Sequence, residues 1–291
     1  MALSRALLDF SPFFLDFLSQ QARSDSRALD RAKAPFWSVP KAPLTEDEDR
    51  RQLHRDLLEL KAERTQHGNR MQGLLAALGL AVEVGWKFLE QLAELRTWDG
   101  QVVPAGLQER LQREFSRWQF VDRQIKDLEK ERVGKIRSEE NQSTQKVRQL
   151  LGLRSIGTNS AWLYVMEFFG WRQLRNRREV ASLAGLTPTP YQSGDSDHEQ
   201  GISKAGNRRL RSMAIEIAWC WLRYQPNSAL SKWYQQRYGP GKSRLRRIGI
   251  VALARKLLVA LWRYLERGEV PAGAEIVDWR TKVGGVAEAG V

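Results

Sequence analysis

Apolar side chains recur three or four residues apart in two long stretches, and this spacing constrains the fold more than any other feature. The first stretch opens with Thr45 and Glu48, which form a capping-box start, and is expected to end near Gly79. The second follows Pro104. No stretch alternates apolar and polar residues as a half-buried strand does. We therefore predict a mainly α-helical protein whose core-facing positions in these helices are Leu53, Leu57, Leu60, Met71, Leu74, Leu75, Leu78, Leu107, Leu111, Phe115, Trp118, Val121, Ile125 and Leu128.

The polar faces of these stretches carry charges of alternating sign, as on the outside of a coiled coil. Two arrangements explain the pattern. The helices either pack against each other within one chain or form a stalk that dimerises with a second copy. Because the heptad pattern lasts for only about three repeats, the sequence leaves both arrangements of this helical or coiled-coil stalk open.

Basic side chains outnumber acidic ones by 47 to 34, and the excess is concentrated in one segment. Residues 1–150 hold 25 basic and 23 acidic residues, whereas residues 203–263 hold 14 basic residues and one acid, Glu216. The positive charges of such a segment repel one another unless anions lie beside them. Binding to the phosphates of a nucleic acid neutralises these charges and also releases counterions. We therefore expect a nucleic acid, first of all DNA, as the partner, in preference to a merely solvated basic face.

Other features exclude several classes of protein. Cys220 is the only cysteine, which excludes a disulfide framework or a multi-cysteine zinc site and suggests a reducing compartment. The longest clean apolar run, Leu74–Val82, is too short to span a bilayer, so no membrane partner is expected. The chain has no phosphate-binding loop or dinucleotide fingerprint, and its three histidines lack metal-ligand spacing.

From about residue 149 the sequence predicts a compact helical domain. Its opening segment, Leu151–Ala161, places small residues between two helices, like a helix-hairpin-helix start. Gly157 precedes the second of these helices, where backbone N–H groups can contact a phosphate. A further helix over about 177–184 is expected to end at a Gly185 C-cap, and residues 191–201 are expected to form a polar loop.

Two helices of this domain are expected to begin with basic residues. Ser203 or Asn207 can cap the first of them. Basic side chains at a helix N-terminus are unfavourable, because this end of the helix dipole is also positive. An external phosphate would offset both the side-chain charges and the dipole. The alternative is that they pair with the acidic loop residues Asp195, Asp197 and Glu199. The predicted nucleic-acid-binding residues are Gly157, then Lys204, Arg208, Arg209 and Arg211 at the first helix, and Lys242, Arg244, Arg246 and Arg247 at the second.

Aromatic residues lie among these basic clusters and can in principle stack on bases. At helical spacing, however, such residues more often face the core. We favour the core for this set, which consists of Trp219, Trp221, Tyr224, Trp233, Tyr234 and Tyr238.

The remaining candidate chemistry is a hydroxyl nucleophile, because carboxylates are sparse in the basic half of the chain. Ser193 lies within Tyr191-Gln-Ser-Gly-Asp195, ahead of the first basic helix. Its hydroxyl can attack a DNA phosphodiester while arginines stabilise the charge on the phosphoryl group. A serine before a glycine is also a common turn residue, so the residues alone leave both roles open.

Four motifs resemble, in content and order, the C-terminal domain of the insertion-sequence one-hundred-ten family of transposases, the relatives of the pilin-gene inversion recombinase. They are Leu183-Ala-Gly-Leu-Thr-Pro188, Tyr191-Gln-Ser-Gly194, Gly201-Ile-Ser-Lys-Ala-Gly-Asn-Arg-Arg-Leu-Arg211 and Ala254-Arg-Lys-Leu-Leu-Val-Ala-Leu-Trp262. The resemblance extends over residues 151–274. The segments Glu63–Arg70 and Gly73–Ala76 are similar to the helical part that joins the family's two domains.

The resemblance implies an enzyme that cuts and rejoins DNA, with Ser193 in the position of the family's nucleophile. Known members act as oligomers and some are guided by a structured RNA, so a homo-oligomer and a guide RNA are implied. Full-length members begin with a RuvC-like domain of the RNase H type, whose carboxylates hold magnesium. No such domain is visible before Val39-Pro40. We therefore expect a chain that lacks it and holds no metal or other cofactor itself, Mg²⁺ being expected only with the missing domain. The alternative is an inactive DNA-binding dimer.

Four regions are expected on this basis. Residues 1–44 form an irregular arm that is a remnant of the metal domain, and residues 45–148 form the helical linker or coiled coil. Residues 149–270 form the C-terminal transposase domain with the serine motif, and residues 271–291 form a flexible tail. The implied location is the bacterial cytoplasm, in association with the nucleoid.

Overall fold

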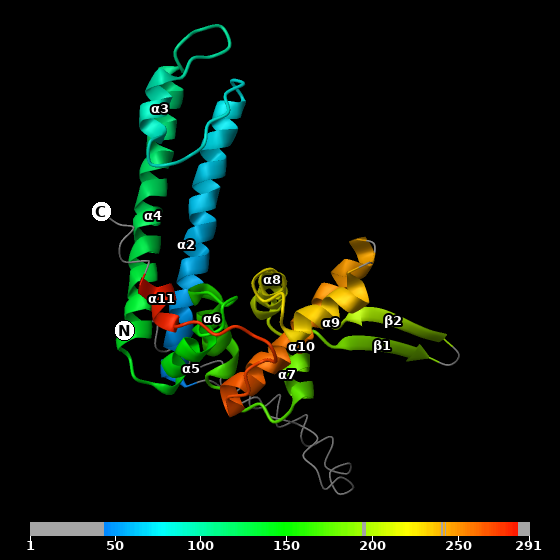
Figure 1. Ribbon diagram of the computed structural model, residues 1–291. Helices are drawn as coiled ribbons and strands as arrows, with labels where there is room; N and C mark the ends of the chain where they lie inside the picture. The colour runs from blue at the N-terminus through cyan, green and yellow to red at the C-terminus, as the bar shows by residue number, and fades with distance from the viewer. Residues whose placement is uncertain (1–43, 194–195, 240, 242, 285–291) are drawn as a thin grey trace, which may run out of the picture. The chain divides into compact units, whose positions relative to one another are not determined.

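Helices account for most of the structure, a computed structural model that describes residues 44–193, 196–239, 241 and 243–284 (Figure 1). The predicted mainly α-helical fold is confirmed. Among the described residues, no helix is both long enough and apolar enough to cross a bilayer. The predicted arm over residues 1–44 lies, except for Leu44, outside the described residues.

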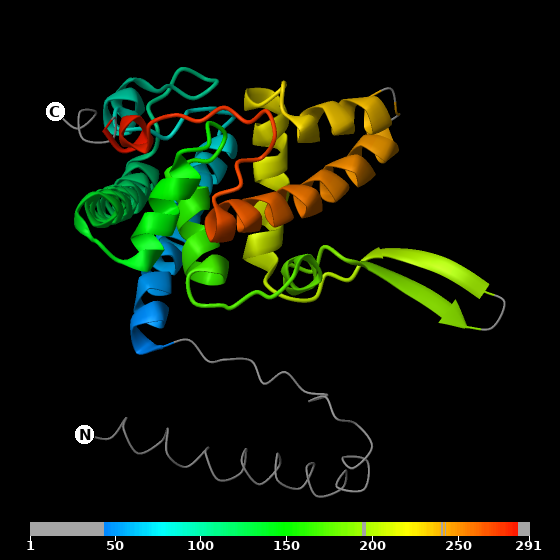
Figure 2. The same ribbon diagram turned by 60° about the horizontal axis from the view of Figure 1, so that its bottom comes forward.

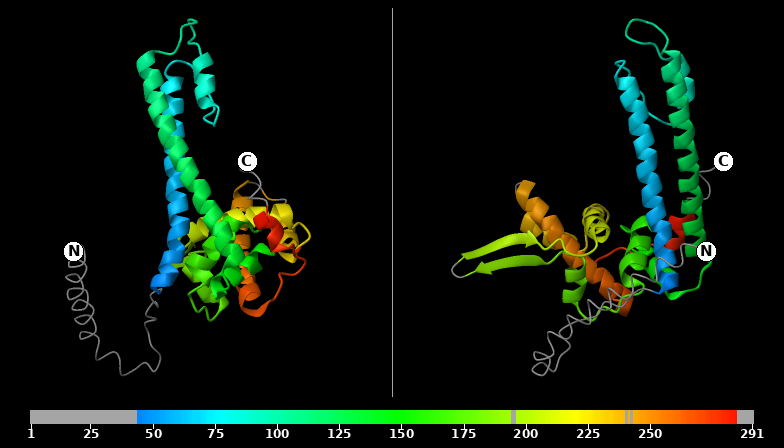
Figure 3. Two further views of the ribbon diagram at one scale, coloured as in Figure 1. Left: turned by 90° about the vertical axis from the view of Figure 1, so that its left-hand side faces the viewer. Right: turned by 180° about the vertical axis from the view of Figure 1, so that it is seen from behind.

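The two long helices, α2 (Thr45–Ala76) and α4 (Ala105–Ser138), lie side by side and run in opposite directions (Figure 3). Their polar contacts establish this direction, because residue numbers rise along α2 while those of the partners fall along α4. The pairs are Lys61–Glu129, Arg64–Asp122 and His67–Glu114. The short helix α3 (Phe88–Glu94) lies in their connection. Of the two arrangements that the apolar spacing allowed, the structure has packing within one chain.

The start of α2 differs from the prediction. Its N-cap is Leu44, which offers no side-chain hydrogen bond, so Thr45 is the first helical residue and the expected capping box does not form. Glu48 instead accepts hydrogen bonds from Arg51 and Arg55. Glu48 thus pairs with side chains of its own helix and not with the backbone of the N-cap residue.

Two hydrophobic clusters line the α2–α4 pair. One lies where α3 packs against it and contains Met71, Leu75, Leu111 and Phe115 among its buried residues. The other includes Leu53, Leu57, Val121 and Ile125 and continues into the core of the following helices. The N-terminal half of α2 and the C-terminal half of α4 therefore contribute to the core of the compact domain.

Helix α5 (Gln142–Leu151) runs across the boundary expected at residues 148/149. A turn then leads to α6 (Thr158–Tyr164), whose N-cap is Gly157, and on to the π-helical turn η2 (Val165–Phe169). The helix-turn-helix arrangement around Gly157 thus agrees with the expected one. All five residues of η2 are buried.

The remaining helices of the domain pack around α10 (Ser243–Arg267), which contacts α7 (Arg177–Leu183), α8 (Arg208–Tyr224) and α9 (Ala229–Tyr238). The aromatic residues assigned to the core divide into three groups, of which Trp233 and Tyr238 are partly buried and pack against it. Trp221 and Tyr234 are fully buried, as expected. Trp219 and Tyr224 are more than 40% exposed, so the core assignment is wrong for these two.

A β-hairpin occupies the segment expected to be a polar loop. Strand β1 (Pro188–Ser193) pairs antiparallel with β2 (Ser196–Ile202) (Figure 2). Their register places Ser193 opposite Ser196. The expectation of no strand was therefore wrong here. The register shift between Pro188 and Pro190 explains how prolines, which lack an N–H donor, fit into a strand.

The C-terminal segment also differs from the expected flexible tail. Val277 donates its N–H to the Gly152 carbonyl (2.8 Å), and Leu153 forms an isolated bridge with Ile276. Helix α11 (Trp279–Gly284) follows, with Val283 fully buried. Residues 271–284 are therefore packed against the α5–α6 turn; residues 285–291 lie outside the described part of the chain.

Candidate nucleic-acid interface

The chain leading into α8 passes directly against the end of α7. Two glycines permit this approach, because each has a positive φ and no side chain. A Cβ on Gly185 would lie 1.9 Å from the Ala205 carbonyl oxygen, and a Cβ on Gly206 would lie 2.1 Å from the Leu183 carbonyl oxygen. The glycines are therefore required for the crossing of the two segments.

Backbone hydrogen bonds hold the crossing together. The Ser203 N–H donates to the Thr187 carbonyl at 2.8 Å, and the Lys204 N–H donates to the Gly185 carbonyl at 3.2 Å. Lys204 itself has a φ of 56°, an uncommon conformation for a residue with a side chain. The base of the hairpin and the start of α8 are thus fixed to each other.

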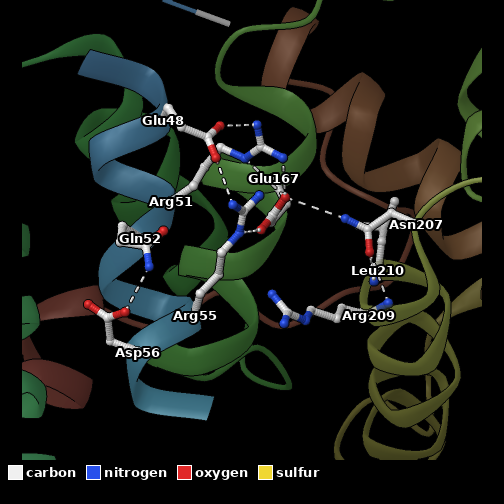
Figure 4. A network of polar contacts seen from close by, with 9 residues as sticks. All are labelled: Glu48, Arg51, Gln52, Arg55, Asp56, Glu167, Asn207, Arg209 and Leu210. Atoms are coloured by element: carbon white, nitrogen blue, oxygen red, sulfur yellow. Dashed lines mark hydrogen bonds and ion pairs between the residues drawn. The ribbon is translucent and has the colours of Figure 1, made fainter. Parts of the chain in front are cut away.

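Asn207 caps α8, which agrees with one of the two caps predicted. Its side-chain oxygen accepts hydrogen bonds from the N–H groups of Arg209 (2.9 Å) and Leu210 (3.3 Å). Its amide nitrogen donates to a Glu167 oxygen at 3.4 Å (Figure 4). The Asn207 side chain therefore caps the N-terminus of α8 and also links this helix to η2.

Glu167 is the centre of this network. It is 2% exposed and receives hydrogen bonds from Arg51 (2.8 and 3.1 Å) and Arg55 (3.1 Å) of α2. Burial by itself would raise the pKa of Glu167, but the hydrogen bonds from the two arginines outweigh it and hold the pKa below its ordinary value. The ionised carboxylate thus links α2, η2 and the first turn of α8.

The first turn of α8 presents the predicted basic residues. Lys204, Arg208 and Arg209 are exposed, while Arg211 is half-buried and donates to the Ala205 carbonyl at 3.4 Å. Among the described side chains, no carboxylate pairs with these four. Asp195, Asp197 and Glu199, the alternative partners, have side chains outside the described set. Among the described residues, the cations at the N-terminus of α8 are therefore not neutralised, although this end of the helix dipole is itself positive.

The second basic cluster lies at the start of α10, as predicted. Arg244, Arg246 and Arg247 are exposed there, and the Arg246 carbonyl accepts a hydrogen bond from the Tyr234 hydroxyl at 3.3 Å. Lys242, the remaining predicted member, lies outside the described residues. Both helix starts thus combine an ordered backbone with exposed cations.

Ser193 lies on a strand rather than in the expected loop. Its Cα pairs with that of Ser196 at the far end of the hairpin, five residues from Pro188 at the base. At about 3.3 Å per residue, the serine backbone is about 17 Å from the hairpin base, where the chain turns toward α8. The structure therefore connects Ser193 to the basic helix start through the hairpin but does not place the two side by side.

Gly157 lies at a different place, next to α4. Together with Thr158 and Asn159 it lines a small cavity of about 250 Å³, to which α4 contributes Glu129 and Arg132. Arg132 is 4% exposed and donates to the Asn159 side chain. None of the other predicted binding residues lines this cavity among the described residues.

The described residues contain no group of three His, Cys, Asp or Glu side chains that could hold a metal ion. The donor set that magnesium requires is therefore not found in this part of the chain. No chemical step is assigned to a metal here.

Reasoning from sequence missed Glu167. A signal was present, since Glu167 is the only charged residue between Arg154 and Arg172, in an otherwise apolar run. A lone acid in such a run is buried only when it is paired. Its partners on α2, more than a hundred residues away, could not be read from the spacing.

Fold and site together define a helical protein with an electropositive surface that carries a projecting hairpin. Residues 147–235 match the model of the transposase IS116/IS110/IS902 family. A putative transposase of Sinorhizobium fredii, y4rJ, is 42% identical over 261 residues, which cover 85% of this chain and 65% of the relative. The transposase of insertion sequence element IS1328 of Yersinia enterocolitica is 26% identical over 78% of this chain and 66% of the relative. The corresponding transposase of IS1111A of Coxiella burnetii is 27% identical over 85% and 67%.

The domain over residues 147–235 belongs to this family of transposases, as the resemblance of its motifs implied. The chain spans slightly less than two thirds of the length of the first two of these relatives. The matched domain begins within α5 and ends within α9, so it includes Gly157, the hairpin and the whole of α8.

Proposed function

We propose that this chain acts in the transposition of an insertion sequence: it binds DNA through the starts of α8 and α10, and cuts and rejoins it through Ser193. The observation that carries the proposal is the first turn of α8, where exposed cations join an oriented helix N-terminus inside the family's matched domain. Phosphate is the anion that such an arrangement accommodates.

In this proposal the Ser193 Oγ attacks a phosphodiester. A bond from oxygen to phosphorus forms, the phosphorus–oxygen bond to one deoxyribose breaks, the serine proton is lost to a base and the released sugar hydroxyl gains a proton. Rejoining runs the same step with a different sugar hydroxyl. Cations near the phosphoryl group lower the barrier because they stabilise its developing charge.

The position of Ser193 on the hairpin supports a site that is completed by other groups. Since Ser193 lies about 17 Å from the hairpin base, the cations of α8 bind flanking phosphates rather than the one attacked. A second copy of the chain, and a structured guide RNA, would supply the remaining contacts. An oligomer that assembles on DNA is therefore part of the proposal.

A second candidate is a protein that binds DNA without cutting it. The place of Ser193 favours keeping this candidate, because its backbone lies about 17 Å from the hairpin base, where the chain turns toward the basic start of α8. The two candidates share the DNA interface and differ only in the chemistry at Ser193.

Covalent trapping separates the two candidates. The full chain is incubated with magnesium and a nicked suicide substrate that carries the ends of its own element, and the adduct is resolved on a denaturing gel. We expect wild type and Ser196→Ala, the control across the hairpin, to form the adduct, and Ser193→Ala to bind DNA without forming it. DNA binding without any adduct supports the second candidate. Adducts formed equally by Ser193→Ala contradict the role of this serine.

A further inference from the structure

A groove of about 980 Å³ lies beside the interface described above. Helix α7, the base of the hairpin, α9, α10 and the segment after α10 form its walls (Figure 1). Among the described residues, Glu269 is the only acidic one that lines the groove, and it pairs with Arg267 at 3.5 Å. Six cationic residues line it: Arg177, Arg178, Arg247, Arg255, Lys256 and Arg263. Only Arg247 belongs to the DNA interface already proposed.

One face of α10 forms the longest wall of this groove. Arginine and valine alternate along it at intervals of four residues, in the order Arg247, Val251, Arg255, Val259, Arg263. At 1.5 Å per residue the three arginines extend over about 24 Å of the helix. Among the described side chains no carboxylate pairs with any of them. The face therefore offers a row of charges separated by apolar surface.

The groove is apolar as well as cationic. Ile248 is 52% exposed and Val270 is 43% exposed, so both present apolar surface to the solvent. Ile202 at the base of the hairpin and Leu230 of α9 extend the apolar lining. A ligand that fits this lining must carry apolar surface beside its negative charges.

Trp233 of α9 provides an aromatic ring in the same groove. The Lys256 Nζ lies over this ring, 4.6 Å from its centroid. A base can take the place of the ammonium group, because both bind the π face of an indole. The lysine would then be free to contact a phosphate.

We propose that this groove binds an unpaired strand of nucleic acid. Phosphates would contact the arginine row, while sugars and bases pack on Val251, Val259 and Trp233, a combination of basic groove and aromatic ring that suits single strands. A duplex presents phosphates at its surface but keeps its bases stacked inside, so it would leave the apolar lining uncovered. The inference rests on the proposed function, because it adds a single-strand site next to the proposed DNA interface of the same domain.

Affinity for three oligonucleotides tests the inference. Fluorescence anisotropy compares labelled dT20, rU20 and a 20-base-pair DNA duplex at one salt concentration. We expect the full chain to bind a single strand more tightly than the duplex. Preference for dT20 would indicate an unpaired DNA strand, and preference for rU20 an RNA strand; either supports the groove. A duplex bound at least as tightly as both overturns it.

Substitutions in the groove make the test specific. Arg255→Gln with Arg263→Gln should weaken single-strand binding and flatten its logarithmic salt dependence by about 1.4, since each phosphate contact contributes about 0.7. Arg110→Gln with Arg113→Gln, on exposed positions of α4, is the matched control and should change neither. Trp233→Leu should cost about tenfold in single-strand affinity, provided its thermal unfolding matches that of wild type.

Photocrosslinking locates the strand independently of folding effects. A dT20 strand with 5-bromouracil is irradiated with the wild-type chain, and the crosslinked peptide is identified by mass spectrometry. We expect crosslinks at Trp233 within Ala229–Tyr238. Crosslinks elsewhere, or groove variants that alter only self-association, overturn the inference. If Arg208→Gln with Arg209→Gln weakens duplex binding while the groove variants have no effect, this inference fails and the proposed DNA interface stands.

Discussion

A single buried carboxylate, Glu167, positions the interface at the scale of the residue. Its two oxygens receive donors from Arg51, Arg55 and Asn207, which come from two helices that are far apart in sequence (Figure 4). Since Asn207 also caps α8, the carboxylate determines where the basic helix begins relative to α2. A charge in the core thus supports the arrangement of charges on the surface.

We predict that Glu167→Gln lowers the free energy of unfolding by about 2 kcal/mol, because the neutral amide loses the charge-assisted hydrogen bonds from Arg51 and Arg55, and Glu48 alone among the described carboxylates still pairs with them. Urea unfolding at pH 7 measures the change. Glu109→Gln, at an exposed position of α4, is the control and should have little effect. Equal stability of Glu167→Gln and wild type would show that the network does not hold α2 to η2 and α8.

His54 is a second buried polar residue, and both of its ring nitrogens lack a hydrogen-bond partner among the described residues. Burial, and then the positive charge of Arg132, lower the pKa of its imidazole from 6.5 to about 4. Between these two pH values the unfolded chain binds a proton that the folded chain does not. The contribution of His54 to stability is therefore complete above pH 6.5 and is lost as the pH falls toward 4.

We predict that the difference in unfolding free energy between wild type and His54→Leu changes by about 3 kcal/mol between pH 7 and pH 4, in favour of the variant at low pH. Urea unfolding at a series of pH values measures it. Leu53→Ala is a control that should reduce stability at every pH and keep the pH dependence of wild type. A constant difference between His54→Leu and wild type over this range would mean that the imidazole has the same pKa in the folded and the unfolded chain.

At the scale of the element, the decisive feature is the crossing of the α7 end with the chain that enters α8. The helix starts could be predicted from the sequence because capping and charge near a helix end are local properties, as Asn207 and Arg208 illustrate. The hairpin could not, since Pro188, Pro190 and polar neighbours have low strand propensity. Its pairing depends on the crossing, and the crossing depends on contacts of Gly185 and Gly206 that spacing does not reveal.

We predict that Gly206→Ala destabilises the fold by about 2 kcal/mol more than Gly201→Ala. Both glycines have a positive φ, near 80°, so both substitutions carry the same backbone strain. At position 206 the new Cβ would clash, at 2.1 Å from the Leu183 carbonyl oxygen, whereas no atom of the described part of the chain lies within 4 Å at position 201. Thermal unfolding of the two variants measures the difference. Equal losses would show that the crossing can open at little cost.

At the scale of the whole molecule, charge separates the chain into a nearly neutral helical pair and a basic domain. Ion pairs such as Lys61–Glu129 and Arg64–Asp122 balance the charges of α2 and α4 within the chain. The described cations at the starts of α8 and α10 form no such ion pair with a described carboxylate. Composition predicted this division correctly, but it could not indicate that the hairpin places Ser193 away from the basic helix starts.

The proposed DNA interface is tested most directly by the salt dependence of duplex binding. Log Kd is measured against log salt for the full chain, for Arg208→Gln with Arg209→Gln, and for Arg110→Gln with Arg113→Gln as a control of equal charge change. We predict that the α8 pair reduces the slope by about 1.8, since each phosphate contact contributes about 0.9, and that the α4 pair leaves it unchanged. Equal slopes for both double variants would contradict DNA binding at the start of α8.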